Sequence, residues 1–122
     1  MGDGALGYTV GELAAVLQHR LDVTMVVLNN SSYGWIRWYR RIAFGRGWEV
    51  DDFVPTDYAA VGSAFGLATE RVEEAGDLAG ALARVAGEPR PGLVEVVSSV
   101  WDTPVEGHRR ALEAGTRSGY GS

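Results

Sequence analysis

Apolar runs alternate along the chain with segments in which apolar residues recur every three or four positions. Residues 23–28 and 93–97 are short runs of mostly apolar residues, as in parallel strands that are buried on both faces. Residues 67–72 are predicted as a further strand, because they begin directly after Gly66 and precede another helical pattern. The pattern therefore predicts three strands, each separated from the next by helices.

Four helices are predicted between and around these strands. The first covers residues 10–20, and Thr9 with Glu12 is the pattern of a capping box at its start. The second carries the stripe Trp35, Trp38 and Tyr39, and the third and fourth cover about residues 57–66 and 77–87. Strands that alternate with helices predict an α/β fold, namely a three-layer α/β/α arrangement around a mostly parallel sheet.

Gly2-Asp3-Gly4 resembles the turn that follows a strand, yet only Met1 precedes it. We therefore expect the sheet to be incomplete at this point.

Composition narrows the possible functions. A chain of 122 residues, with 46% hydrophobic and 22% charged residues, is the size and composition of one globular domain. The net charge of −5 disfavours nonspecific nucleic-acid binding, so no nucleic-acid partner is expected. The absence of cysteine excludes a disulfide scaffold, a cysteine-ligated metal and a thiol nucleophile. No apolar run approaches the ~20 residues of a membrane span, and the N-terminus lacks a signal-peptide pattern, so we expect a cytoplasmic protein without a membrane partner.

The most informative pattern is Gly2-Asp3-Gly4 followed, after 24 residues, by Asn29-Asn30. Both motifs are expected at βα turns, and successive turns of a parallel sheet lie side by side beyond its carboxyl edge. Asp3 and Asn30 should therefore be close in space. Their oxygen atoms suit Mg²⁺, which is often shared with phosphates, and the glycines let the backbone approach a diphosphate.

The two motifs together, at this spacing, resemble the signature of thiamine diphosphate-dependent enzymes. The wider segments GDGALGYTVGEL and VVLNNSSYGW are similar to the C-terminal diphosphate-binding domain of the acetolactate synthase, benzaldehyde lyase and pyruvate decarboxylase superfamily. The resemblance covers about residues 2–104. It predicts a partial thiamine diphosphate-binding domain over residues 1–104 and a C-terminal tail over residues 105–122.

The resemblance implies thiamine diphosphate and Mg²⁺ as cofactors and assigns roles to individual positions. The implied Mg²⁺ ligands are the Asp3 carboxylate, the Asn30 amide and the Ser32 backbone carbonyl. The implied cofactor-binding residues are Gly2, Asp3, Gly4, Ala5, Asn30, Ser32, Tyr33 and Gly34, with backbone N–H groups of Gly4 and Ala5 on the diphosphate and Tyr33 and Gly34 closing over it.

The resemblance further implies one portion of a 2-oxo acid decarboxylase or carboligase. The family's activating glutamate belongs to a pyrimidine-binding domain outside this chain, on the same or another chain, so the isolated chain is expected to be inactive and the enzyme to be a homo-oligomer. Trp35 is expected to face the pocket for a small 2-oxo acid or aldehyde, where acetolactate synthases typically have Met. Ile36 replaces the catalytic Glu typical of pyruvate decarboxylases.

Other candidate residues have simpler interpretations. His19 and His108 are expected to be solvated, and Ser31-Ser32 lack the pattern of a catalytic triad. The arginines and aromatic residues of 31–48 are expected to form an amphipathic helix on the sheet, with the arginines paired to Glu49, Asp51, Asp52 and Asp57. The alternative function, from a different class, is a non-catalytic remnant or interaction module that keeps the fold without activity.

Overall fold

A parallel sheet of three strands forms the centre of the molecule in the computed structural model, which describes residues 1–45 and 51–100. The strands are β1 (Thr24–Asn29), β2 (Ala68–Val72) and β3 (Gly92–Val97), in the order β1-β3-β2. Leu93 of β3 is in register with Met25 of β1 and Thr69 of β2. The three strands expected from the sequence are confirmed to within about one residue at each end.

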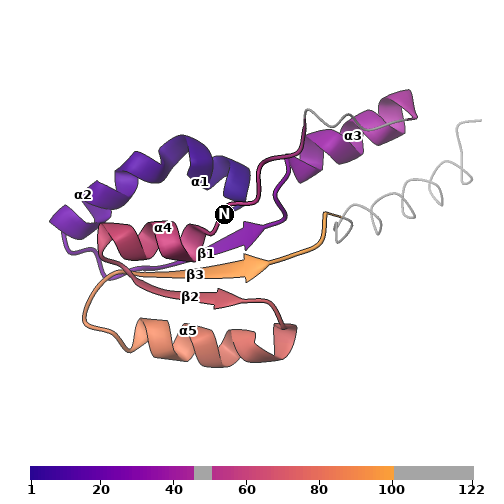
Figure 1. Ribbon diagram of the computed structural model, residues 1–122. Helices are drawn as coiled ribbons and strands as arrows, with labels where there is room; N and C mark the ends of the chain where they lie inside the picture. The colour runs from indigo at the N-terminus through magenta and orange to yellow at the C-terminus, as the bar shows by residue number, and fades with distance from the viewer. Residues whose placement is uncertain (46–50, 101–122) are drawn as a thin grey trace, which may run out of the picture.

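Helices cover both faces of this sheet, as Figure 1 shows, so the predicted three-layer α/β/α arrangement is confirmed. One face carries α1 (Asp3–Thr9), the 3₁₀ turn η1 (Val10–Glu12), α2 (Leu13–Gln18) and α4 (Tyr58–Phe65). The other carries the 3₁₀ turn η3 (Ala75–Asp77) and α5 (Leu78–Ala86).

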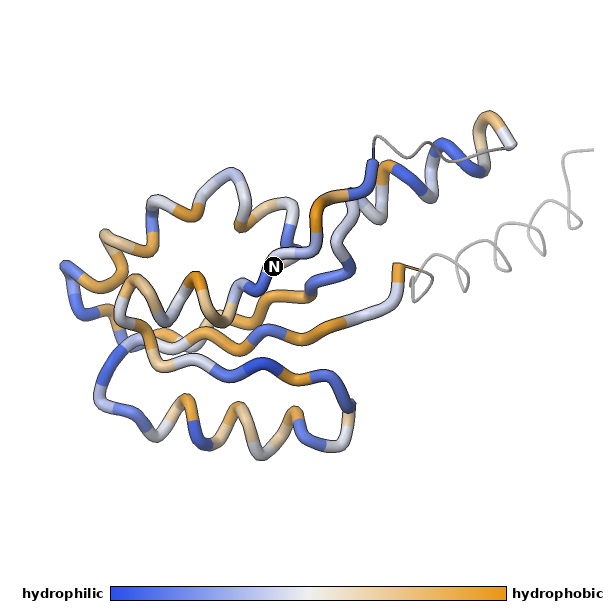
Figure 2. Tube along the Cα trace, viewed as in Figure 1, coloured by the Kyte–Doolittle hydropathy of each residue, from blue (hydrophilic) through white to orange (hydrophobic). Residues whose placement is uncertain are grey.

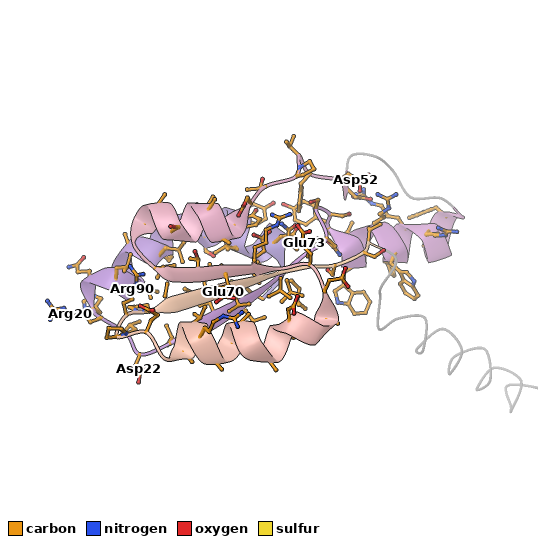
Figure 3. The ribbon with its side chains drawn as sticks, turned by 60° about the horizontal axis from the view of Figure 1, so that its bottom comes forward. Arg20, Asp22, Asp52, Glu70, Glu73 and Arg90 are labelled. Atoms are coloured by element: carbon orange, nitrogen blue, oxygen red, sulfur yellow. The ribbon has the colours of Figure 1, made fainter. Side chains whose placement is uncertain are left out.

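Each face of the sheet has its own apolar core because successive residues of a strand point to opposite faces. Leu93 belongs to the core beneath α1, α2 and α4, whereas its neighbour Val94 belongs to the core beneath α5. Figure 2 shows that hydrophobic residues concentrate along β1 and β3. On the α5 face, Glu70 of β2 accepts two hydrogen bonds from Arg84 of α5, at 2.6 and 2.7 Å, and Figure 3 shows Glu70 between the sheet and this helix.

The first helix begins seven residues earlier than predicted. Gly2 is the N-cap of α1, and the Gly2 carbonyl accepts hydrogen bonds from the N–H groups of Ala5 and Leu6. The expected capping box is wrong, because the Thr9 hydroxyl donates back to the carbonyl of Ala5 at 3.1 Å. Asp3 therefore lies in the first turn of a helix instead of in a free turn.

The end of β1 has a short neighbour on its outer side. The Leu28 N–H donates to the Met1 carbonyl at 2.8 Å, and the Met1 amino group donates to the Val26 carbonyl at 2.7 Å. Gly2 also forms a parallel bridge with Leu28. Met1 and Gly2 thus occupy the place of the last residues of a further parallel strand, which agrees with the turn-like sequence that follows them.

The third helix was predicted accurately at its ends. The Asp57 carboxylate accepts a hydrogen bond from the Ala60 N–H at 2.7 Å, and Gly66 ends the helix with φ +108°, in the left-handed region. The helical periodicity of residues 57–66 predicts an inward-facing Phe65, but Phe65 is exposed, while Ala59 and Gly62 are the buried residues of α4. Small residues there let the helix approach the sheet closely.

The second helix, α3 (Gly34–Phe44), does not lie on the sheet as predicted. It projects away from the layers (Figure 1), and the side chains of Trp35 and Tyr39 are 68% and 64% exposed. Both faces of the sheet are already covered by other helices, so no sheet surface is left for α3. Two of the expected arginine pairs are present, however: Arg37 pairs with Asp52, and Arg40 pairs with Asp51 at 2.5 Å. Asp57 lies 3.8 Å from Arg71 of β2 instead.

Within the part of the chain that the structure describes, no helix is long and apolar enough to cross a membrane. The predicted tail, 105–122, and His108 lie outside the described residues, as do Glu49 and residues 46–48. His19 is exposed, as predicted.

Candidate functional site

Two loop regions meet at the carboxyl edge of the sheet. One is the start of α1, at residues 2–5, and the other is the turn of residues 29–34 that joins β1 to α3. Between them lies a pocket of about 390 Å³. It is lined by all nine residues that were predicted to bind cofactor, metal or substrate: Gly2, Asp3, Gly4, Ala5, Asn30, Ser32, Tyr33, Gly34 and Trp35. The structure thus brings the two motifs together.

Asp3 is the charged group at the base of this pocket. It is 3% exposed, and its buried Oδ2 atom has no hydrogen-bond partner among the described residues. Burial raises the pKa of the Asp3 carboxyl, while backbone N–H groups of its own turn and of Ser31 and Ser32 partly offset this rise. A buried carboxylate oxygen without a partner is costly unless a cation or a proton binds it.

The turn after β1 presents Asn30 to the pocket. The Asn30 Oδ1 atom accepts a hydrogen bond from the Ser32 N–H at 3.1 Å, and a carbonyl oxygen has a second lone pair for another partner. Ser32 is buried, and its hydroxyl donates to the Asp51 carbonyl at 2.9 Å. A Cβ atom on Gly34 would lie 2.7 Å from the Asn30 Nδ2 atom, so glycine is required for this close approach.

An aromatic cluster joins the two loop regions. The Tyr33 ring stacks on Tyr8 of α1 with 6.2 Å between centroids, and its hydroxyl donates to the Tyr8 hydroxyl at 2.6 Å. Phe53 and Tyr33 form a T-shaped pair with 4.4 Å between ring centroids, and a Cβ atom on Gly4 would lie 2.9 Å from the Tyr33 ring. The hydrogen bond to Tyr8 raises the pKa of Tyr33. Tyr33 therefore covers the start of α1 next to Asp3.

Two polar residues near this site, Asn29 and Glu95, have no role assigned from the sequence. Asn29, unlike Asn30, points away from the pocket and donates from Nδ2 to the Glu95 carboxylate at 2.6 Å and to the Thr56 carbonyl at 2.8 Å. Glu95 lies in β3 and is fully buried. The signal that could have identified Glu95 is a single charged residue within the apolar run of residues 93–97.

The described residues contain no group of three or more His, Cys, Asp or Glu side chains that could hold a metal by themselves. The pocket instead offers one carboxylate, one amide oxygen and backbone groups around open space. Such an oxygen-rich but incomplete set suits Mg²⁺ that shares its coordination with a phosphate ligand.

Comparison with known proteins agrees with this chemistry. Residues 1–96 match the family described as "Thiamine pyrophosphate enzyme, C-terminal TPP binding domain". The chain belongs to this family. Thiamine pyrophosphate, which is thiamine diphosphate, is the cofactor of the family, and Mg²⁺ typically accompanies it.

The thiamine pyrophosphate enzyme relatives are much longer than this chain. It is 30% identical over 101 residues to benzoylformate decarboxylase from Pseudomonas aeruginosa, across 79% of this chain and 18% of the relative. It is 21% identical over 98 residues to the acetolactate synthase large subunit of Cyanidium caldarium, across 79% and 17%. The chain therefore spans about a fifth of these relatives.

A solved structure has the same fold over this thiamine pyrophosphate-binding domain. The thiamine diphosphate-dependent 4-hydroxybenzoylformate decarboxylase of Rhodococcus jostii RHA1 superposes with a TM-score of 0.74 at 25% identity, covering 81% of this chain and 19% of that one. The resemblance to this superfamily inferred from the sequence is thus confirmed. The roles of individual residues stay predictions.

Proposed function

We propose that this chain supplies the diphosphate- and Mg²⁺-binding part of a thiamine diphosphate-dependent 2-oxo acid decarboxylase or carboligase. Asp3, Asn30 and the Ser32 carbonyl would hold Mg²⁺, and N–H groups of Gly4 and Ala5 would receive the diphosphate. Thiamine diphosphate, when bound, supplies a thiazolium carbon that adds to carbonyl compounds and accepts their electrons. The protein's part is binding and orientation.

The observation that carries this proposal is the buried Asp3 carboxylate with its unpartnered Oδ2 atom. Backbone N–H groups of its own turn and of Ser31 and Ser32 favour the charged form of Asp3, but they leave Oδ2 without a partner among the described residues. A divalent cation would give this oxygen a partner and compensate the charge. This argues for a working metal site over the alternative of a remnant that keeps only the fold, since a remnant gains nothing from an unpaired buried carboxylate.

The proposed substrate is a small 2-oxo acid or aldehyde, and Trp35 is the proposed residue that faces it. Trp35 lines the same pocket as Asp3, and its exposed indole leaves room for contact with a ligand. Ile36 also lines the pocket, and an aliphatic side chain cannot transfer a proton. Proton transfer during the reaction is therefore not assigned to Ile36, and we propose that the pyrimidine-binding domain supplies the activating group.

The proposed partner is a pyrimidine-binding domain, on the same or another chain, within a homo-oligomer. The exposed aromatic residues of α3 next to the pocket support a neighbour at this side. Because the chain spans about a fifth of its relatives, the remaining parts of the site are expected from such a domain.

Calorimetric titration of thiamine diphosphate tests this proposal, in millimolar Mg²⁺ and again in excess chelator. Binding is expected to require Mg²⁺ and to weaken about tenfold or more in Asp3→Ala, which loses a charged ligand. Asp22→Ala is the matched control, because Asp22 is exposed and lies at the opposite end of the molecule from α3 (Figure 3). Equal affinity in chelator, or in Asp3→Ala, would contradict the proposal.

A further inference from the structure

Glu95 is a fully buried carboxylate that the proposed metal and cofactor site does not use. It lies in the central strand β3 and is 0% exposed. Its Oε1 atom accepts hydrogen bonds from Asn29 Nδ2 at 2.6 Å and from Arg71 Nη1 at 3.3 Å. Its Oε2 atom accepts from the Ala59 N–H at 2.9 Å. One side chain thus joins the end of β1, the strand β2 and the start of α4.

If Glu95 only filled space in the core, a carboxylate would be an unfavourable side chain at this position, because burying its charge costs free energy. Removing a charge from water costs several kcal/mol, and a buried ion pair is often no more stabilising than apolar residues of similar size. Arg71 also divides its charge, since it lies 3.2 Å from Glu73 and 3.8 Å from Asp57. The ion pair with Arg71 alone therefore does not explain why a glutamate occupies position 95.

The contact with Asn29 leads directly to the pocket. Glu95 and the Thr56 carbonyl fix the Nδ2 end of the Asn29 amide, so its Oδ1 end faces the following turn. There Oδ1 accepts hydrogen bonds from the Ser31 N–H at 3.0 Å and from the Ser31 hydroxyl at 3.3 Å. Ser31 has φ +52°, a left-handed conformation that a non-glycine residue adopts only at some cost.

The held turn is the one that presents Asn30 and Ser32. The Asn30 Oδ1 atom accepts a hydrogen bond from the N–H of Ser32, across Ser31. Asn30 and Ser32 both line the pocket beside Asp3. Asn29 does not line this pocket but lines a second one with Arg71, which Asn30 also borders. The two asparagines thus have different tasks: Asn29 is held by Glu95, and Asn30 faces the pocket beside Asp3.

We propose that Glu95 is a positioning residue for the cofactor site. Through Asn29 it fixes the left-handed turn at Ser31 and thereby the placement of Asn30 and Ser32, without touching the ligand itself. This inference rests on the proposed function for the meaning of the turn, but the order of the turn can be measured without any ligand.

Three variants separate positioning from stabilisation. Glu95→Gln keeps the shape but offers only one acceptor oxygen to the three donors. Glu95→Met combined with Arg71→Met replaces the ion pair by apolar side chains, an exchange that often preserves stability. Val85→Ala is the matched control for lost stability, because Val85 is a buried residue of α5 and belongs to the core on the other face of the sheet from α4.

The first measurement is amide hydrogen exchange in the full chain without ligand. We expect the Ser31 amide to lose protection in Glu95→Gln and in the double Met variant, more than in Val85→Ala at an equal loss of Tm. An Asn29→Ala background should abolish this effect of Glu95→Gln, because the link is then already broken. Unchanged protection of Ser31 in both Glu95 variants would overturn the proposal.

The second measurement is Mn²⁺-dependent binding of thiamine diphosphate to the same variants. Loss of a residue that orients metal ligands typically weakens metal binding about tenfold to a hundredfold, and we expect this range for Glu95→Gln. Binding equal to that of Val85→Ala would overturn the positioning role while leaving the proposed function intact. A natural chain that binds no Mn²⁺ would instead contradict the proposed function, and the exchange of Ser31 would still decide whether Glu95 orders the turn.

Discussion

The proposed metal site depends most on the carboxylate of Asp3. Its buried, unpartnered Oδ2 atom means that the metal-free protein carries an uncompensated charge in the folded state. We predict that Asp3→Asn makes the metal-free chain more stable, by about 1 kcal/mol, since an unsatisfied buried polar group costs ~1–3 kcal/mol and the charged form costs more than the amide. Urea unfolding in chelator measures this difference.

The same substitution has a predicted pH dependence. Because the pKa of Asp3 is raised in the folded state, the folded chain binds this proton more tightly than the unfolded chain. The stability that this proton contributes is fully present below the pKa of Asp3 in the unfolded chain. It is lost as the pH rises through the raised pKa of Asp3 in the folded chain. The advantage of Asp3→Asn should therefore grow from about pH 4 to pH 7, and an advantage that shrinks over this interval would contradict the assignment.

A second prediction at this scale concerns Gly34. In Gly34→Ala the new Cβ atom would lie 2.7 Å from Asn30 Nδ2, so the Asn30 side chain must move. Mg²⁺-dependent binding of thiamine diphosphate should weaken while Tm changes little. Gly11→Ala is the control, because a Cβ atom there meets nothing within 4 Å. Equal binding by the two variants would show that Asn30 is not needed where the structure puts it.

Single residues also show where sequence reasoning succeeded and where it stopped. Asp3 and Asn30 could be brought together in advance, because parallel strands place successive βα turns at one edge of the sheet. The different tasks of Asn29 and Asn30 could not, since the direction of the Asn29 amide depends on Glu95, 66 residues away along the chain. Contacts at that separation are set by strand order, which local patterns do not encode.

Among the secondary-structure elements, α3 differs most from its prediction. The apolar stripe correctly predicts that these residues form a helix. It does not indicate whether the surface that packs against the stripe belongs to the same chain. A helix lying on the sheet would place Trp38 and Tyr39 of its stripe in the core. Tyr39 is instead exposed and Trp38 is only half-buried, in a T-shaped contact with Trp35 at 6.2 Å between ring centroids. The strands and α4, by contrast, were predictable, because their partners are local turns and neighbouring βα units.

This arrangement of α3 predicts small effects on stability. Trp38→Ala should lower the free energy of unfolding of the chain by about 1 kcal/mol, the scale of one aromatic contact. Leu93→Ala, in the fully buried core, should cost ~2–5 kcal/mol. Thermal and urea unfolding of the two variants compare these values. A loss for Trp38→Ala as large as that for Leu93→Ala would mean that α3 packs on the sheet after all.

The whole molecule leaves apolar surface and strand edge uncovered within its described residues. β1 is an edge strand of the described sheet, and Met1 and Gly2 cover only its end, from Val26 to Leu28. The side chains of Trp35 and Tyr39 of α3 are also exposed. Exposed edges and apolar patches favour association. We predict that the chain alone self-associates as its concentration rises in sedimentation velocity experiments, and that it does not turn over pyruvate with added cofactor. A stable monomer with decarboxylase activity would contradict both expectations.

The most direct test of the central claim is a crystal structure of the chain with Mn²⁺ and thiamine diphosphate, with the metal located by its anomalous scattering. We expect an anomalous peak in the pocket between the start of α1 and the turn of residues 29–34. Metal-to-oxygen distances to Asp3 and Asn30 should be about 2.0–2.2 Å, as for octahedral hard cations, with diphosphate oxygens completing the shell. Bound cofactor with the metal elsewhere, or with Asp3 still unpartnered, would contradict the central claim.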